Sequence, residues 1–130
     1  MKRLFFIMGL FILTVNVWSQ ENYHHQFSSA PETSRFQIIQ SEMGVRYTFN
    51  IDKYSGNVFQ LVKSKSGLTW QIIEAEIQDY DEKKPNQVNY QIFTSGSGVR
   101  YTFLINVNTG ITWQLTEDKK TGVLFWSALK

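Results

Sequence analysis

The sequence has no cysteine, two histidines and two prolines in 130 residues. Without cysteine there are no disulfide bonds and no thiolate nucleophile, so the folded part must be held together by a packed core. The histidines are adjacent, His24 and His25, which leaves the rest of the chain without an imidazole for acid–base chemistry. No segment carries a sustained helical stripe of apolar residues. These absences favour a β-rich domain and disfavour histidine-dependent catalysis.

The only long apolar run lies at the start of the sequence. Lys2 and Arg3 precede the run LFFIMGLFILTV at 4–15, and the small residue Ser19 follows it. This layout is typical of a secretory signal peptide. Asn16 interrupts the run well before the about 20 apolar residues that a membrane span needs. We therefore expect residues 1–19 to be a signal peptide, and the protein to be exported to the periplasm or the cell exterior with no membrane span after cleavage.

The rest of the chain is nearly neutral. Without Lys2 and Arg3 it keeps 11 basic and 11 acidic side chains. A neutral domain lacks the basic surface that binds nucleic acid. Residues 20–34 show no periodicity and contain Ser, Pro and Glu, which predicts a flexible leader. The folded domain is expected to comprise residues 35–130.

Within this domain, residues 36–66 are repeated at 90–120. The two segments align without a gap at an offset of 54, with 14 of 31 positions identical, including the run GVRYTF. Such self-similarity indicates one supersecondary unit that occurs twice, in which neither copy is expected to bury its apolar face alone. The predicted organisation is a single β domain made of two repeats, 35–73 and 89–127, joined by a solvated connector at 74–88.

Each repeat is predicted to be a four-stranded antiparallel meander. Residues 45–52 alternate strictly between apolar and polar side chains, which is the period of a half-buried strand. Gly56 and Gly110 close turns that begin with Asp or Asn, a combination suited to bulged hairpins. We expect Phe49 and Phe103 to be equivalent core residues. The large aromatic residues Trp70, Trp113 and Trp126 are also assigned to the core.

Eight predicted strands leave few ways to avoid exposed edges. Closure into a small pseudo-twofold barrel, or folding over into a sandwich, removes most of the edge, and this all-β architecture is our prediction. A propeller-like arrangement is the alternative, because IDKYSGNVFQL and INVNTGITWQL look like the strand–turn–strand of quinoprotein-type propeller blades. Two copies are fewer than a propeller needs, so the propeller ranks second.

The duplicated pattern R-Y-T-F-x-I-[DN]-x-x-[ST]-G-x-x-[FW]-Q-L also resembles that of small uncharacterised exported bacterial proteins built from β-hairpin repeats. The resemblance covers residues 35–127. It departs slightly between copies, with Phe59 facing Trp113 and Asp52 facing Asn106 in the alignment. The resemblance implies turns and a core, and it brings no catalytic residue and no cofactor.

The candidates for chemistry are few. His24 and His25 lie in the predicted leader, and a metal site needs three or four converging ligands, so no metal site is predicted. The repeats contain four carboxylates, and a turn carboxylate that an amide can replace favours capping over catalysis; they are Glu42, Asp52, Glu117 and Asp118.

The best candidates for binding are the equivalent arginines Arg46 and Arg100. Both alternate with Val, Tyr and Phe along a strand, which places them on the face opposite the apolar one. A polar, symmetric face for a carboxylate, sugar or peptide would combine them with Thr48, Thr102, Gln60, Gln114, Gln37 and Gln91. A solvated sheet face with cross-strand pairing is the alternative interpretation.

The sequence thus predicts an exported, non-enzymatic β-repeat module. Its expected partner is a cell-envelope component, a glycan or a protein, or its role is structural. The alternative is a small exported hydrolase whose acidic residues the sequence does not identify. The sequence does not decide between a monomer and a homo-oligomer.

Overall fold

A computed structural model describes residues 27–28, 30–41, 47–76, 81–94 and 101–130. Within these ranges the regular structure is β-strand, and there is no α-helix. Alternation of apolar and polar residues accounts for the strands, and glycine or Asx residues account for the turns between them. The strands are β1 Phe27–Ser28, β2 Phe36–Gln40, β3 Thr48–Asp52, β4 Asn57–Ser64, β5 Gly67–Ala75, β6 Tyr90–Thr94, β7 Thr102–Asn106, β8 Thr112–Glu117 and β9 Leu124–Ala128.

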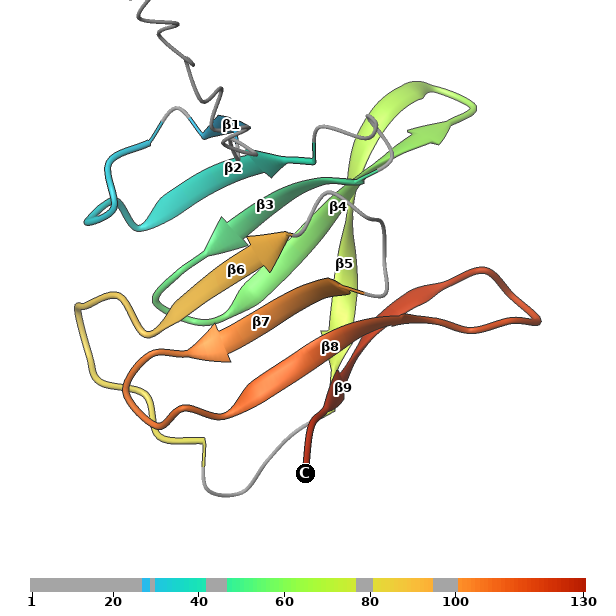
Figure 1. The fold of residues 1–130 in the computed structure, drawn as a ribbon. Coiled ribbons are helices and arrows are strands. Elements are labelled where there is room, and N and C mark those ends of the chain that lie inside the picture. The colour runs from blue at the N-terminus through green and yellow to red at the C-terminus, as the bar shows by residue number, and fades with distance from the viewer. Residues whose placement is uncertain (1–26, 29, 42–46, 77–80, 95–100) are drawn as a thin grey trace, which may run out of the picture.

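The strands form one continuous sheet in the order β1-β2-β3-β4-β5-β9-β8-β7-β6. Strands β2 to β5 make the first meander and β6 to β9 the second, and together these eight strands curl into a nearly closed barrel (Figure 1). The two-residue β1 adds to the edge of β2. The predicted all-β class and the two four-stranded meanders are confirmed. Of the closures considered, a barrel-like sheet forms and separate propeller blades do not.

The repeat in the sequence is reproduced in the strand register. Phe36 lies opposite Asp52 in the first meander, and Tyr90 lies opposite Asn106 in the second, so both pairs keep the offset of 54. The turns agree as well, since Gly56 has φ 81° and Gly110 φ 77°. A Cβ at Gly56 would also lie 3.0 Å from the Tyr90 ring. Both the positive φ and this close approach therefore favour glycine at position 56.

The junction between the meanders turns the second copy over. Strands β5 and β9 pair in parallel, whereas every other neighbouring pair is antiparallel. Because β5 and β9 are parallel neighbours, a half-turn about an axis along these strands relates the two copies. Such a half-turn also exchanges the two faces of the sheet. Because side chains alternate between faces, the inward face of the first copy corresponds to the outward face of the second.

This inversion corrects our expectation for the two phenylalanines. Phe49 is 0% exposed, but its equivalent Phe103 is only partly buried and stacks on the exposed Phe93, with ring centroids 6.4 Å apart. In the opposite sense, Asn50 is partly exposed while its equivalent Leu104 is buried. Phe49 and Phe103 are therefore not equivalent core residues, because the copies present opposite faces to the interior.

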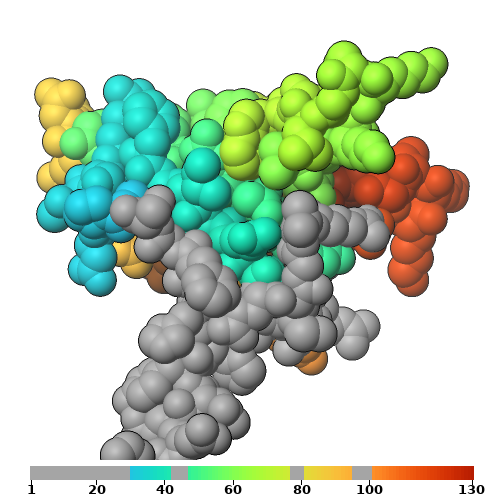
Figure 2. All heavy atoms as spheres, turned by 90° about the horizontal axis from the view of Figure 1, so that it is seen from above, coloured from blue at the N-terminus to red at the C-terminus, as the bar shows by residue number. Residues whose placement is uncertain are grey.

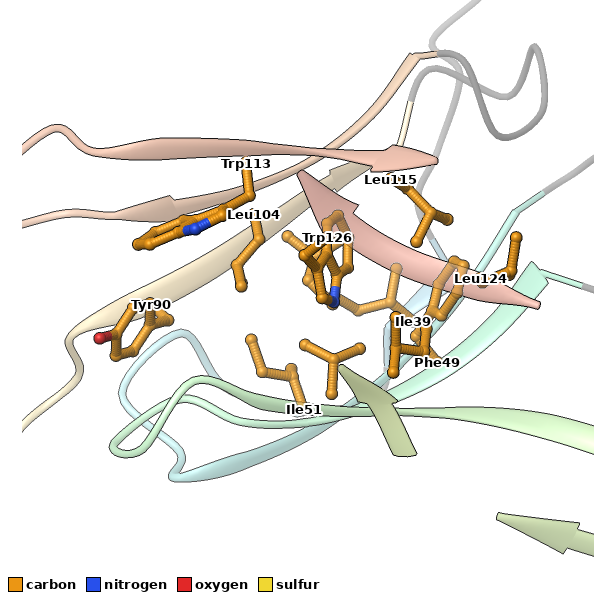
Figure 3. Packing of buried hydrophobic residues seen from close by; sticks show 12 residues of the cluster. Ile39, Phe49, Ile51, Tyr90, Leu104, Trp113, Leu115, Leu124 and Trp126 are labelled. Carbon is orange, nitrogen blue, oxygen red and sulfur yellow. The ribbon is translucent and has the colours of Figure 1, made fainter. Parts of the chain in front are cut away.

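Both copies contribute to a single core (Figure 3). Trp113 and Trp126 are buried in it as predicted, whereas Trp70 is 38% exposed on the outer face of β5, so the core assignment was wrong for Trp70. The core consists of Ile39, Phe49, Ile51, Val58, Ile73, Tyr90, Ile92, Leu104, Trp113, Leu115, Leu124 and Trp126.

Backbone hydrogen bonds tie the second copy to the first at the start of β6. The carbonyl of Lys53 accepts from the N–H groups of Asn89, at 2.8 Å, and Tyr90, at 2.9 Å. The Asn89 side-chain amide donates to the carbonyls of Tyr54, at 3.0 Å, and Lys84, at 2.8 Å. The end of the connector is thus anchored, while its residues 82–87 are exposed.

Candidate functional site

The residues of the predicted polar face lie in different environments. Arg46 and Arg100 are outside the described residues. Gln60 alternates with buried Val58 and lies on the inner face of β4, whereas Gln114 lies between buried Trp113 and Leu115 and so points to the outer face of β8.

The remaining members of that face are two equivalent threonines and two equivalent glutamines. Thr48 and Thr102 are both buried, at 7% and 3% exposure. Gln37 and Gln91 line one small pocket of about 150 Å³ between β2 and β6. The described members therefore do not gather around one symmetric centre, and the part played by the two arginines stays a prediction.

The described carboxylates of the repeat turns act as local hydrogen-bond acceptors. Asp52 accepts from the Arg35 guanidinium at 2.8 Å and from the Tyr54 N–H at 3.0 Å. Asp118 accepts from the N–H groups of Lys120 and Thr121. These bonds lower the pKa of both carboxyl groups. His24, His25 and Glu42 are outside the described residues, and within those residues no three His, Cys, Asp or Glu side chains are placed to hold a metal ion.

A buried polar cluster surrounds Asp81 of the connector. Its carboxylate accepts hydrogen bonds from the Tyr90 hydroxyl and from the Asn106 side-chain amide, the latter at 2.6 Å. Burial, followed by the hydrogen bond to Asp81, raises the pKa of the Tyr90 phenol. A phenol that is held neutral and donates to a carboxylate stabilises the fold, so we assign this cluster to fixing the connector against the barrel.

Lys53 is the one buried cation among the described residues. Its ammonium donates to the carbonyl of Glu32, and it lines the small pocket between β2 and β6. Burial lowers its pKa, and Glu32 raises it by a smaller amount. The alignment of the two copies does not single out this lysine, because Lys53 is replaced by Val107 in the second copy.

An apolar depression lies where β5 and β9 diverge. They pair only at Glu74 and Ala75, and from there the β4–β5 and β8–β9 hairpins separate and project from the same end of the molecule (Figures 1 and 2). The space between them is a groove of about 590 Å³. We call it the hairpin groove; its lining consists of residues 60–63, 68, 71–73 and 121–124.

The hairpin groove is predominantly apolar, and much of its apolar surface faces solvent. Leu68 is 69% exposed and Ile72 45% exposed on one wall, and Val123 is 50% exposed on the other. Amides are supplied by Gln60 and Gln71. Lys63 is the ionisable side chain of the lining, so the groove can hold an uncharged ligand without burying an opposing charge.

Sequence reasoning missed most of this groove. The core assignment of Trp70 placed the strand that also carries Leu68 and Ile72 with its apolar face inward, whereas all three residues are exposed. The signal that was available is the uncharged seven-residue run GLTWQII at 67–73, which is unusual for a strand that faces solvent. Of the predicted site residues, Gln60 lies in the hairpin groove.

Comparison of the chain with family models, with curated proteins and with solved structures finds no match. The described residues contain no helix that could span a membrane.

Proposed function

We propose that this chain is an exported, non-enzymatic binding module and that the hairpin groove is its binding site. The observation that carries the proposal is an apolar groove of about 590 Å³ whose walls leave Leu68, Ile72 and Val123 in contact with solvent. This volume falls within the range of ligand sites, about 300–1,000 Å³. Exposed apolar side chains gathered in one depression are typical of a surface that a ligand or partner covers.

The chemistry of the lining favours an uncharged, largely apolar ligand over a glycan. Most of the lining is aliphatic, and the amides of Gln60 and Gln71 can orient a polar group of the ligand. A glycan would require a denser set of polar partners for its hydroxyl groups. Among the predicted partners, this supports a protein segment or an apolar envelope component.

The proposal is tested with an uncharged apolar fluorophore, N-phenyl-1-naphthylamine, titrated into the purified protein. Val123→Glu places a carboxylate in the groove, and we expect it to weaken binding of the fluorophore by at least about tenfold, because an apolar ligand that covers the carboxylate removes its water. Val107→Glu is the matched control, since Val107 is 44% exposed in a different turn. Equal fluorophore affinity in the two variants would contradict the assignment of the groove.

A further inference from the structure

Strand β5 has an open edge along most of its length, and this edge borders the hairpin groove. The strand spans Gly67–Ala75, and β4 pairs with it continuously from Gly67 to Ile73. On the other side β9 pairs only with Glu74 and Ala75. Among the described residues, therefore, no strand pairs with the first seven residues of β5 on the side facing β9.

The backbone groups that point toward this edge can be identified from the existing pairs. The N–H of Glu76 donates to the carbonyl of Trp126 in β9 at 3.0 Å. Successive residues of a strand direct their N–H and C=O groups to opposite sides. The groups of Leu68, Trp70 and Ile72 therefore point toward the β9 side, where they can accept and donate hydrogen bonds to an added strand.

This edge carries none of the devices that normally prevent pairing. The segment at 67–73 contains no charged residue and no proline. Its residues 67–72 are all exposed, with Leu68, Trp70 and Ile72 on one face. A long, uncharged and apolar edge strand pairs readily with another strand. By contrast, the outer edge of β2 is paired by β1.

We propose that the hairpin groove binds an extended segment of a partner polypeptide, which inserts between β5 and β9 as an added strand. This inference rests on the proposed function and names the class of ligand. An extended backbone supplies N–H and C=O groups at the spacing of the β5 edge, which an acyl chain does not. Because β5 and β9 are parallel, a strand antiparallel to one is antiparallel to both, and antiparallel pairing is the more stable arrangement.

The open edge and the lining define the segment. Seven residues of β5 span about 23 Å, so the partner contributes about five to seven uncharged residues, with β-branched or aromatic side chains at alternate positions. A single added strand needs about 4.8 Å beside β5. The β4–β5 hairpin of a second copy would bring two strands into a groove that the β8–β9 hairpin already bounds, and this favours a partner segment over a second copy.

The experiment uses random nine-residue peptides displayed on phage and selected on the purified protein. We expect enrichment of uncharged sequences with alternating β-branched or aromatic residues. Hydrogen exchange is then measured with the best synthetic peptide. The amides of Leu68, Trp70 and Ile72 should become protected by at least about tenfold, whereas those of Thr69 and Gln71, which face β4, should change little.

A pair of variants separates backbone pairing from side-chain contact. Ile72→Ala shortens the side chain and keeps the N–H, whereas Ile72→Pro also removes the N–H that points to the open edge without removing a bond to β4. We expect the peptide to bind Ile72→Pro at least about tenfold more weakly than Ile72→Ala. Equal affinities, with both variants folded by circular dichroism, would overturn strand addition.

The remaining outcomes distinguish this inference from the proposed function. If the apolar fluorophore binds but no peptide is enriched, or if a peptide binds without protecting the three amides, strand addition is wrong and the groove remains a binding site. If neither fluorophore nor peptide binds, both proposals fail. If protection of the three amides rises with protein concentration alone, a second copy occupies the groove and the partner segment is refuted.

Discussion

At the scale of single residues, Asp52 and Asn106 occupy equivalent turn positions but have different side-chain hydrogen-bond partners. Asp52 accepts two hydrogen bonds from Arg35, at 3.0 and 2.8 Å. Asn106 is fully buried and donates to Asp81. In both copies the side-chain oxygen also accepts the backbone N–H two residues later, at 3.0 Å in the first turn and 2.9 Å in the second. Both turns therefore use the same hydrogen bond from a backbone N–H to the side-chain oxygen. The charged residue, Asp52, occurs in the copy where Arg35 pairs with it.

This pairing gives the fold an acid-sensitive component. The hydrogen bond from Arg35 is the largest cause of the lowered pKa of Asp52. A carboxyl with a lowered folded-state pKa stabilises the fold above its unfolded pKa, and this stabilisation is lost as the pH falls through the folded pKa. We expect Asp52→Asn to have a lower free energy of unfolding than the parent at pH 7 and a shallower loss of stability below about pH 4.

Urea unfolding between pH 7 and pH 2.5 measures this difference. Asp118→Asn is the control, because the pKa of Asp118 is lowered by backbone N–H groups rather than by an arginine. Asp52→Asn is expected to lose some of its free energy of unfolding at low pH. This remaining loss is expected to be smaller in the double variant Asp52→Asn/Asp118→Asn. If the free energy of unfolding of Asp52→Asn falls as steeply with decreasing pH as that of the parent, protonation of Asp52 does not contribute to the acid sensitivity of the fold.

At the scale of elements, strands β3 and β7 have nearly the same sequence and opposite orientations. Phe49 of β3 is in the core, whereas Phe103 of β7 forms part of an outer aromatic pair with Phe93. We expect Phe49→Ala to cost about 3–5 kcal/mol of the free energy of unfolding. Phe103→Ala is expected to cost about 1 kcal/mol, since it loses mainly one cross-strand aromatic contact.

Chemical denaturation of the two variants under identical conditions tests the inversion. Phe93→Ala is the matched control, because it removes the other member of the outer pair and should resemble Phe103→Ala in its cost. Similar large costs for Phe49→Ala and Phe103→Ala would mean that both copies bury the same face, contrary to the parallel junction between β5 and β9.

At the scale of the whole molecule, the two copies share one core and neither is complete alone. Residues of the first copy such as Ile51 pack with second-copy residues such as Trp126. We expect the chain cut after Asp79 to aggregate, because one meander leaves its apolar face without a partner. Size-exclusion chromatography and the urea dependence of circular dichroism measure this. A soluble half that unfolds cooperatively would contradict the shared core.

Local sequence patterns were enough to predict the strands, the turns and the duplicated register. Strict alternation specifies an extended strand with two distinct faces, and the Asp or Asn that opens a turn closed by Gly56 or Gly110 acts through bonds within a few residues. These are local effects, so they can be inferred without knowledge of the packing.

Which face of each copy lies inside, and where the hairpin groove opens, depends on how the two copies pack together. Alternation in β7 offers two faces, and both carry apolar residues, because Leu104 replaces Asn50 on the face opposite Phe103. That single replacement is weak evidence for which face of β7 is buried. The choice is made by the parallel pairing of β5 with β9, which turns the second copy over, and by their divergence, which opens the hairpin groove. The paired residues of β5 and β9 are 51 positions apart. Their pairing depends on the closure of the whole sheet, and local sequence patterns do not encode it.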